Sequence, residues 1–153
     1  MSPETRIEEL GLRLPEAVPP AFNYLAVVEH AGTAWVAGQI PRDGQKVLFT
    51  GKCGAEISLE QGREAARACV LAGLAQLRLA LGSLARVQRV LKVTGFIASA
   101  PGFTQQPQVL DAASDLLVAV FGEAGRHARS AIGVAELPRG VPVEVEFVVA
   151  VGA

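Results

Sequence analysis

Aromatic residues are scarce in this chain, at 5% of 153 residues, and its positive and negative charges nearly cancel. Fourteen Lys and Arg residues against fifteen Asp and Glu residues leave a formal charge of −1. A dedicated nucleic-acid binder usually carries a clear basic excess, and single-strand binders add aromatic side chains on which bases stack. Both absences argue against a nucleic-acid partner.

Cysteines and long apolar runs are also few. Cys53 and Cys69 are too few for a disulfide scaffold and lack the spacing of a zinc site, so no metal site is predicted. The longest uncharged helical run, 68–77, is about half of the ~20 residues that a membrane span needs. The first 20 residues mix acids with arginines around no apolar centre, unlike a signal peptide. We therefore expect a soluble cytoplasmic protein with no membrane partner.

What the chain does have is the apolar content of a single folded domain. Half of its residues are hydrophobic, and its length suits one domain. Residues 1–20 are polar and end in two prolines, so we interpret them as an N-terminal leader packed on the outside of one domain, 21–153. Turn signals then predict strands, helices and further strands in the order β-β-α-β-α-β-β: strands over 24–30 and 33–37, a helix over 58–82, a strand over 87–99, a helix from Pro107 to 121–122, and strands over 130–135 and 143–151. This order predicts an α+β domain in which two helices cover one face of a mixed sheet.

The first predicted helix carries its own start and stop signals. Ser58 and Gln61 have capping-box spacing, and Gly82 suits the terminating turn. One side of this helix holds only small residues: Gly62, Ala65, Ala66, Cys69, Ala72 and Gly73. A side of this kind lets a helix approach a sheet closely, and it makes Cys69 a buried structural thiol.

Residues that could carry chemistry gather near the C-terminus. Arg129 lies just before an apolar strand, and Glu144 and Glu146 share one face of another because strand side chains alternate. Carboxylates on so apolar a strand need a partner or a wet cleft. No phosphate loop or metalloprotease motif is present, and the two histidines, His30 and His127, are interpreted as ordinary surface or core residues.

Several motifs over 32–151 resemble the RidA (YjgF) family, once called L-PSP endoribonucleases and known for enamine and imine deamination. The matching motifs are Gly38-Gln39-Ile40-Pro41, the strand Val90-Leu-Lys-Val-Thr-Gly-Phe96, and Ala128-Arg-Ser130 followed by Leu137-Pro138 and Val143-Glu-Val-Glu146. The resemblance implies a chorismate-mutase-like fold and a homotrimer whose sheets form a central barrel. It also implies active sites in the clefts between subunits.

The resemblance further implies roles for individual residues. Arg129 falls on the arginine that grips the substrate carboxylate, and a guanidinium fork suits that task. The alternative for Arg129 is a structural ion pair with a strand carboxylate. Glu144 falls on the glutamate beside the hydrolytic water, and Glu146 is interpreted as an interface or structural group. Gly38 and Gln39, from the matching Gly-Gln-Ile-Pro motif, are further candidates for substrate binding.

The chain departs from the best-studied members of that family at three positions. Leu25 stands where those members carry a tyrosine that lines the site, with Tyr24 one residue away. Ala37 replaces the usual serine before Gly-Gln. Ser114 lies nearest to the family's site asparagine and is the remaining candidate for substrate binding, with Asp111 one turn before it. These features indicate a divergent branch of the family.

The resulting hypothesis is hydrolysis of a small imine, formed from an enamine, to a 2-keto acid and ammonia. An imine is already electrophilic, so no cofactor is expected, and the partner is a small carboxylate-bearing substrate. Two alternatives stay open: a trimer that binds a small carboxylate without turnover, and an endoribonuclease. The apolar final strand leaves more apolar surface than a two-layer domain covers, which also favours a trimer.

Overall fold

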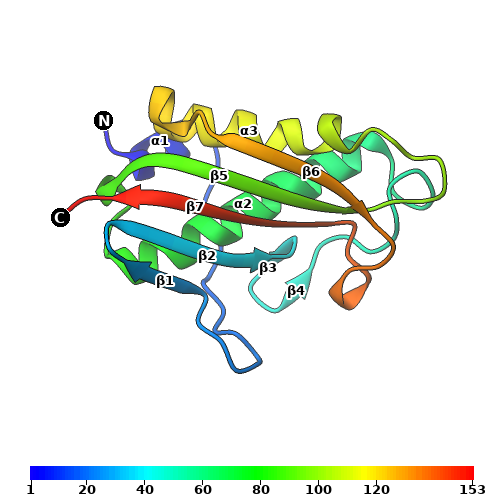
Figure 1. The fold of residues 1–153 in the computed structure, drawn as a ribbon, viewed down its shortest axis with the longest axis horizontal. Helices are drawn as coiled ribbons and strands as arrows, with labels where there is room; N and C mark the ends of the chain where they lie inside the picture. The colour runs from blue at the N-terminus through cyan, green and yellow to red at the C-terminus, as the bar shows by residue number, and fades with distance from the viewer.

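The computed structural model describes Met1–Ala153 and contains a five-stranded sheet with helices on one face (Figure 1). The strands lie side by side in the order β1, β2, β7, β5, β6, in which β5 and β6 are parallel and the other neighbours are antiparallel. Their bounds are β1 Val27–His30, β2 Thr33–Gln39, β5 Val87–Ala98, β6 Ala128–Val134 and β7 Val143–Val151. The predicted α+β architecture and the mixed sheet are confirmed.

Two long helices, α2 (Leu59–Leu81) and α3 (Gln106–Phe121), cover one face of the sheet and pack against each other. Ser58 caps α2 through the predicted capping box with Gln61, and Gly82 ends it with a left-handed φ of 84°. In Figure 1 the strands lie in front of α2, so the view is onto the face of the sheet that the helices leave open.

Glycines set how closely the helices approach the sheet. A Cβ at Gly73 of α2 would lie 2.5 Å from the Phe147 ring of β7, which explains the small-residue side of that helix. A Cβ at Gly95 of β5 would meet the Leu110 side chain of α3 at a similarly short distance. Leu110 therefore packs directly onto β5, and this contact holds α3 close to the edge of the sheet.

Replacing Gly95 by alanine is expected to destabilise the protein by about 1–3 kcal/mol, because the added methyl overpacks the Leu110 contact and pushes α3 outward. Urea unfolding of Gly95→Ala measures the loss. Thr94→Ala is the matched control, since Thr94 lies on the open face of the same strand. A Gly95→Ala protein as stable as the parent would contradict this account of the helix–sheet contact.

The N-terminal segment contains a helix that the sequence did not predict. This helix, α1 (Pro3–Glu9), buries Ile7 within the main core. The Glu4 carboxylate accepts hydrogen bonds from the Ser83 hydroxyl and the Leu84 amide, at the start of the short 3₁₀ turn η1 (Leu84–Arg86). The segment is thus tied to the domain by both apolar and polar contacts.

The region between β2 and α2 also differs from the prediction. A two-residue hairpin, β3 (Arg42–Asp43) with β4 (Lys46–Val47), occupies the expected loop. The first strand begins at Val27 rather than at residue 24: its register with β2 starts at Val27 opposite Val36, and one further backbone hydrogen bond joins the Ala37 amide to the Ala26 carbonyl before the pairing stops. Two more 3₁₀ turns, η2 (Gly122–Gly125) and η3 (Pro138–Gly140), precede β6 and β7.

The face of the sheet opposite the helices is exposed and carries both apolar and charged side chains. Trp35 is 56% exposed, and Val28 and Ile132 on the two outer strands are also exposed. Glu144 and Glu146 of the central strand β7 lie on the same face. No helix in the structure is long and apolar enough to cross a membrane.

Candidate functional site

Arg129 lies on the edge strand β6 and points toward α3. Its register partner on β5 is Val93, a core residue, so the Arg129 side chain is on the helix-covered face. Its Nη1 donates to Asp111 Oδ1 at 2.8 Å and to Ser114 Oγ at 3.2 Å. The Arg129 side chain is 22% exposed and that of Asp111 54%, so the ion pair borders solvent. The predicted alternative partner was a strand carboxylate; the actual partner is on a helix.

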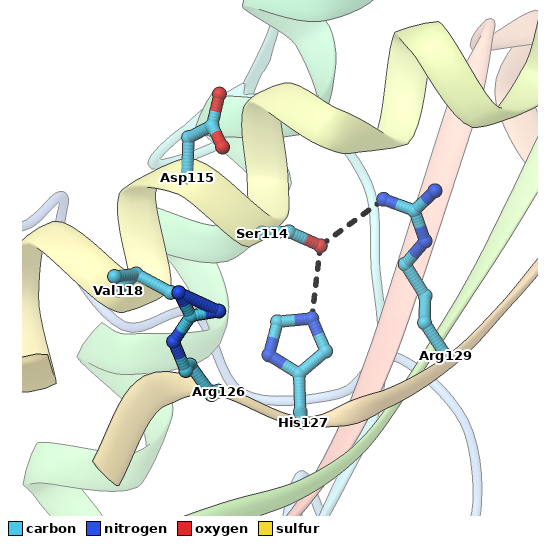
Figure 2. A pocket seen from close by; sticks show the side chains of 6 residues that line it. All are labelled: Ser114, Asp115, Val118, Arg126, His127 and Arg129. Carbon is cyan, nitrogen blue, oxygen red and sulfur yellow. Dashed lines mark hydrogen bonds between the residues drawn. The ribbon is translucent and has the colours of Figure 1, made fainter. Parts of the chain in front are cut away.

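A hollow of about 270 Å³ opens beside this arginine. Figure 2 shows its six lining residues, which come from α3 and from the segment entering β6: Ser114, Asp115, Val118, Arg126, His127 and Arg129. Two guanidinium groups stand on either side of the His127 ring, and Asp115 points away from it. The hollow can admit a small molecule and offers positive charge to an anion.

His127 links the hollow to the backbone. Its Nδ1 lies 2.6 Å from the carbonyl oxygen of Gly125, and its Nε2 lies 2.8 Å from Ser114 Oγ. A carbonyl only accepts, so Nδ1 carries the proton and Nε2 accepts the Ser114 hydroxyl proton. Burial lowers the pKa of His127, and the charge of Arg129 lowers it further, although the Gly125 carbonyl opposes both. The ring is therefore neutral at pH 7.

Glu144 lies on the central strand β7 and points to the open face. Its register partner on β5 is Phe96. The residues before and after each of the two face the helices, so Phe96 and Glu144 both face the open side. Its carboxylate makes no hydrogen bond or ion pair within the chain. A Cβ at Gly38 would lie 2.8 Å from Glu144 Oε2, so the glycine of the Gly-Gln-Ile-Pro motif leaves room for this carboxylate. Burial raises the pKa of Glu144, and the nearby charge of Glu146 raises it further.

The five predicted site residues thus fall into separate groups. Arg129 and Ser114 meet on the helix side, whereas Glu144 and Gly38 meet on the open side of the same sheet. Gln39 joins neither group: it is 5% exposed, packs near Gly73 of α2, and its amide donates to the Ala37 carbonyl. Within one chain, the arginine and the glutamate therefore face opposite sides of the sheet.

The raised pKa of Glu144 predicts a pH-dependent stability. Between the ordinary carboxyl pKa and the raised one, the folded chain binds more protons than the unfolded chain, so stability falls as pH rises through that window. Glu144→Gln removes this fall, and the variant should melt at a higher temperature than the parent at pH 7 but not at pH 4. Melting curves across that range test it, with Glu9→Gln, an exposed carboxyl of α1, as control. Parallel curves for parent and Glu144→Gln would contradict the unpaired state of Glu144.

Two residues of the site were not singled out from the sequence. Asp111 was noted only by its position in the second helix, and His127 was interpreted as structural. Each acts through contacts 13 to 18 residues away, which no short motif contains. The one signal in the sequence was the order strand, helix, strand around α3. When the two strands are parallel, this order brings the middle of the helix over the start of the second strand. No group of three or more His, Cys, Asp or Glu side chains gathers as a metal site.

Comparison with known proteins agrees with this fold. Residues 4–143 match the family described as "YjgF/chorismate mutase-like, putative endoribonuclease". Protein TCP17 of Trypanosoma cruzi is 46% identical over 144 residues, covering 94% of this chain and 90% of that protein. The crystal structure of Atu1372 from Agrobacterium tumefaciens, of unknown function, is 38% identical with a TM-score of 0.91, over 99% of this chain and 92% of that one. A crystal structure from Shewanella oneidensis, described as a "putative endoribonuclease", is 32% identical to this chain with a TM-score of 0.95. The match covers 99% of this chain and 100% of that one.

Proposed function

Because the chain belongs to the YjgF/chorismate mutase-like family, as its Gly-Gln-Ile-Pro and Ala-Arg-Ser motifs predicted, we propose that it hydrolyses small reactive imines. The substrate is the imine tautomer of an enamine that carries a carboxylate, and the products are a 2-keto acid and ammonia. The reaction needs an anion anchor and a group that activates water. The chain supplies one of each.

The observation that carries this proposal is the state of Glu144. Half-buried carboxyl groups without a partner are costly, and carboxyls whose pKa is raised by burial and a like charge gather at functional sites. Glu144 is such a group, and the missing Cβ at Gly38 leaves room for its carboxylate. A carboxylate poised in this way can take a proton from water near neutral pH.

Arg129 supplies the anchor. Its guanidinium borders the hollow, and Asp111 and Ser114 fix its orientation from α3. A substrate carboxylate can replace part of that ion pair, since the Asp111 side chain remains half-exposed to solvent. Water then attacks the C=N carbon while Glu144 takes its proton. The tetrahedral intermediate collapses to the keto group as the nitrogen, protonated in turn, leaves as ammonia.

The two groups meet only if subunits assemble. Arg129 and Glu144 lie on opposite sides of the sheet, so one molecule of substrate must contact Arg129 of one subunit and Glu144 of a second. The exposed sheet face that carries Glu144 and Trp35 supplies the surface for that assembly, because large exposed hydrophobic residues favour an interface. We propose a homotrimer, in which three such faces enclose a central barrel.

Light scattering at micromolar concentration should give about 48 kDa, three times the 16.0 kDa of the chain. Trp35→Lys, which places a charge on the most exposed large residue of the open face, should shift the mass toward the monomer. Leu79→Lys, at a still more exposed position on α2, is the control and should leave the trimer intact. A monomer in the parent protein would overturn both the assembly and the shared site.

The proposed activity is tested with 2-aminoacrylate released in a coupled reaction. The rate of pyruvate and ammonia formation above the uncatalysed rate measures deamination. Turnover supports the proposal, and binding of pyruvate without turnover supports a second candidate, a non-catalytic carboxylate-binding trimer. Ala37 favours that candidate, because it leaves a methyl where related deaminases have a hydroxyl next to the Gly-Gln motif.

An endoribonuclease activity, which the family description includes, has less support. The hollow has no aromatic lining residue on which a base could stack, and the chain has no basic excess. RNA digestion compared between the parent and Arg129→Ala decides this point, because contaminating nuclease would be insensitive to the substitution.

A further inference from the structure

The Ser114–His127 pair has the geometry of an activated nucleophile. The Ser114 hydroxyl donates to His127 Nε2 at 2.8 Å (Figure 2), and His127 Nδ1 donates to the Gly125 carbonyl at 2.6 Å. A serine, a neutral base within hydrogen-bond reach and a third group that orients the base are the elements of nucleophilic catalysis. Here a backbone carbonyl takes the orienting position that a carboxylate occupies in a triad.

The Ser114 side chain makes its hydrogen bonds outside its own helix. A serine in a helix interior commonly bonds back to the carbonyl four residues earlier. Ser114 lies in the middle of α3, yet both partners of its hydroxyl come from the segment that enters β6: His127 takes its proton and Arg129 donates to its oxygen. The hydroxyl lines the hollow, so a small molecule in the hollow can reach it.

The positive groups around the hydroxyl suit a developing negative charge. Arg129 Nη1 lies 3.2 Å from Ser114 Oγ, and Arg126 lines the same hollow from the far side of the ring. The ion pair between Arg126 and Glu123 is largely exposed, so its guanidinium is easily drawn to another anion. Donors aimed at a forming oxyanion are commonly the largest single contribution to acyl-transfer catalysis.

We propose that Ser114 and His127 form a nucleophile–base pair that cleaves esters of small carboxylic acids through an acyl-Ser114 intermediate. Ser114 Oγ attacks the ester carbonyl while its proton passes to His127 Nε2, and Arg129 faces the oxyanion. The C–O bond to the alcohol breaks as His127 returns the proton to it. Water, deprotonated by the same nitrogen, then releases the acid and restores Ser114. This reaction is separate from imine hydrolysis and does not use Glu144.

Labelling with a small fluorophosphonate, followed by mass spectrometry of the α3 peptide, tests the nucleophile directly. The parent protein should carry the label on Ser114, and His127→Gln should reduce the labelling rate at least 100-fold. His30→Gln, an exposed histidine at the end of β1, is the matched control and should label like the parent. Absence of label on Ser114 in folded parent protein overturns the proposal, and this result needs no variant.

Hydrolysis of p-nitrophenyl acetate supplies the second readout. Ser114→Ala and His127→Gln should each lose at least 10-fold of the parent rate, whereas Glu144→Gln should keep it while losing deamination. That contrast separates failure of the ester reaction from failure of the imine reaction. Equal ester rates in the parent and in a folded His127→Gln protein would overturn the role of His127 as the base.

Discussion

Glu144→Gln is expected to lower the rate of imine hydrolysis ~100-fold or more, because glutamine keeps the shape of the side chain but cannot take a proton from water. Binding of pyruvate should be unchanged, since the proposed anchor, Arg129, lies on the opposite face of the sheet from Glu144. Deamination of 2-aminoacrylate and calorimetric titration with pyruvate measure the two effects.

Glu146→Gln is the matched control for this experiment. Glu146 is the next side chain on the same face of β7, and it is exposed rather than half-buried. The substitution removes the negative charge of Glu146, which raises the pKa of Glu144. It should change the rate of imine hydrolysis only a few-fold. Full activity in Glu144→Gln would move the water-activating role to another group.

Arg129→Ala should weaken pyruvate binding at least ~100-fold, which corresponds to about 2.7 kcal/mol. The stability cost should be only about 1 kcal/mol, because the ion pair with Asp111 borders solvent and the remaining carboxylate can be hydrated. A buried pair would instead cost several times more when one partner is removed. Calorimetric titration and thermal melting of the same preparation separate these outcomes.

Asp111→Asn provides the comparison that isolates the anchor. It removes the same ion pair but keeps the guanidinium, so its melting temperature should resemble that of Arg129→Ala while its affinity for pyruvate equals or exceeds that of the parent. Unchanged pyruvate binding in Arg129→Ala, or a collapsed melting curve, would contradict the anchor role.

Local signals predicted most of the fold. The capping box at Ser58 and Gln61 and the terminal Gly82 act within one turn of α2, so neighbouring residues alone determine where that helix starts and stops. Strand alternation likewise placed Glu144 and Glu146 on one face. The short α1 could not be predicted in this way, because a seven-residue helix is marginal by itself and is held by Ile7 in the core and by the Glu4 contacts with residues about 80 positions away.

The candidate site likewise has features that local sequence predicts and features that depend on long-range contacts. Motif resemblance singled out Arg129 and Glu144, and the structure gives each a distinctive environment. The opposite orientation of the two side chains depends on the sheet order and register, which are long-range properties. The bonds of Arg129 to Asp111 and of His127 to Ser114 depend on how closely α3 lies over β5 at Gly95, and no pattern within either segment encodes that distance.

The position of β7 has a consequence for how the chain is made. This strand lies between β2 and β5, at the centre of the sheet, and takes part in two of the sheet's four strand pairings. β7 follows the other four strands of the sheet in the chain, so those strands leave the ribosomal exit tunnel without their central partner. The nascent chain can form α2 and the first hairpin, but its sheet can close only after β7 has emerged. Loss of residues 143–151 would therefore remove the middle of the sheet rather than trim its edge.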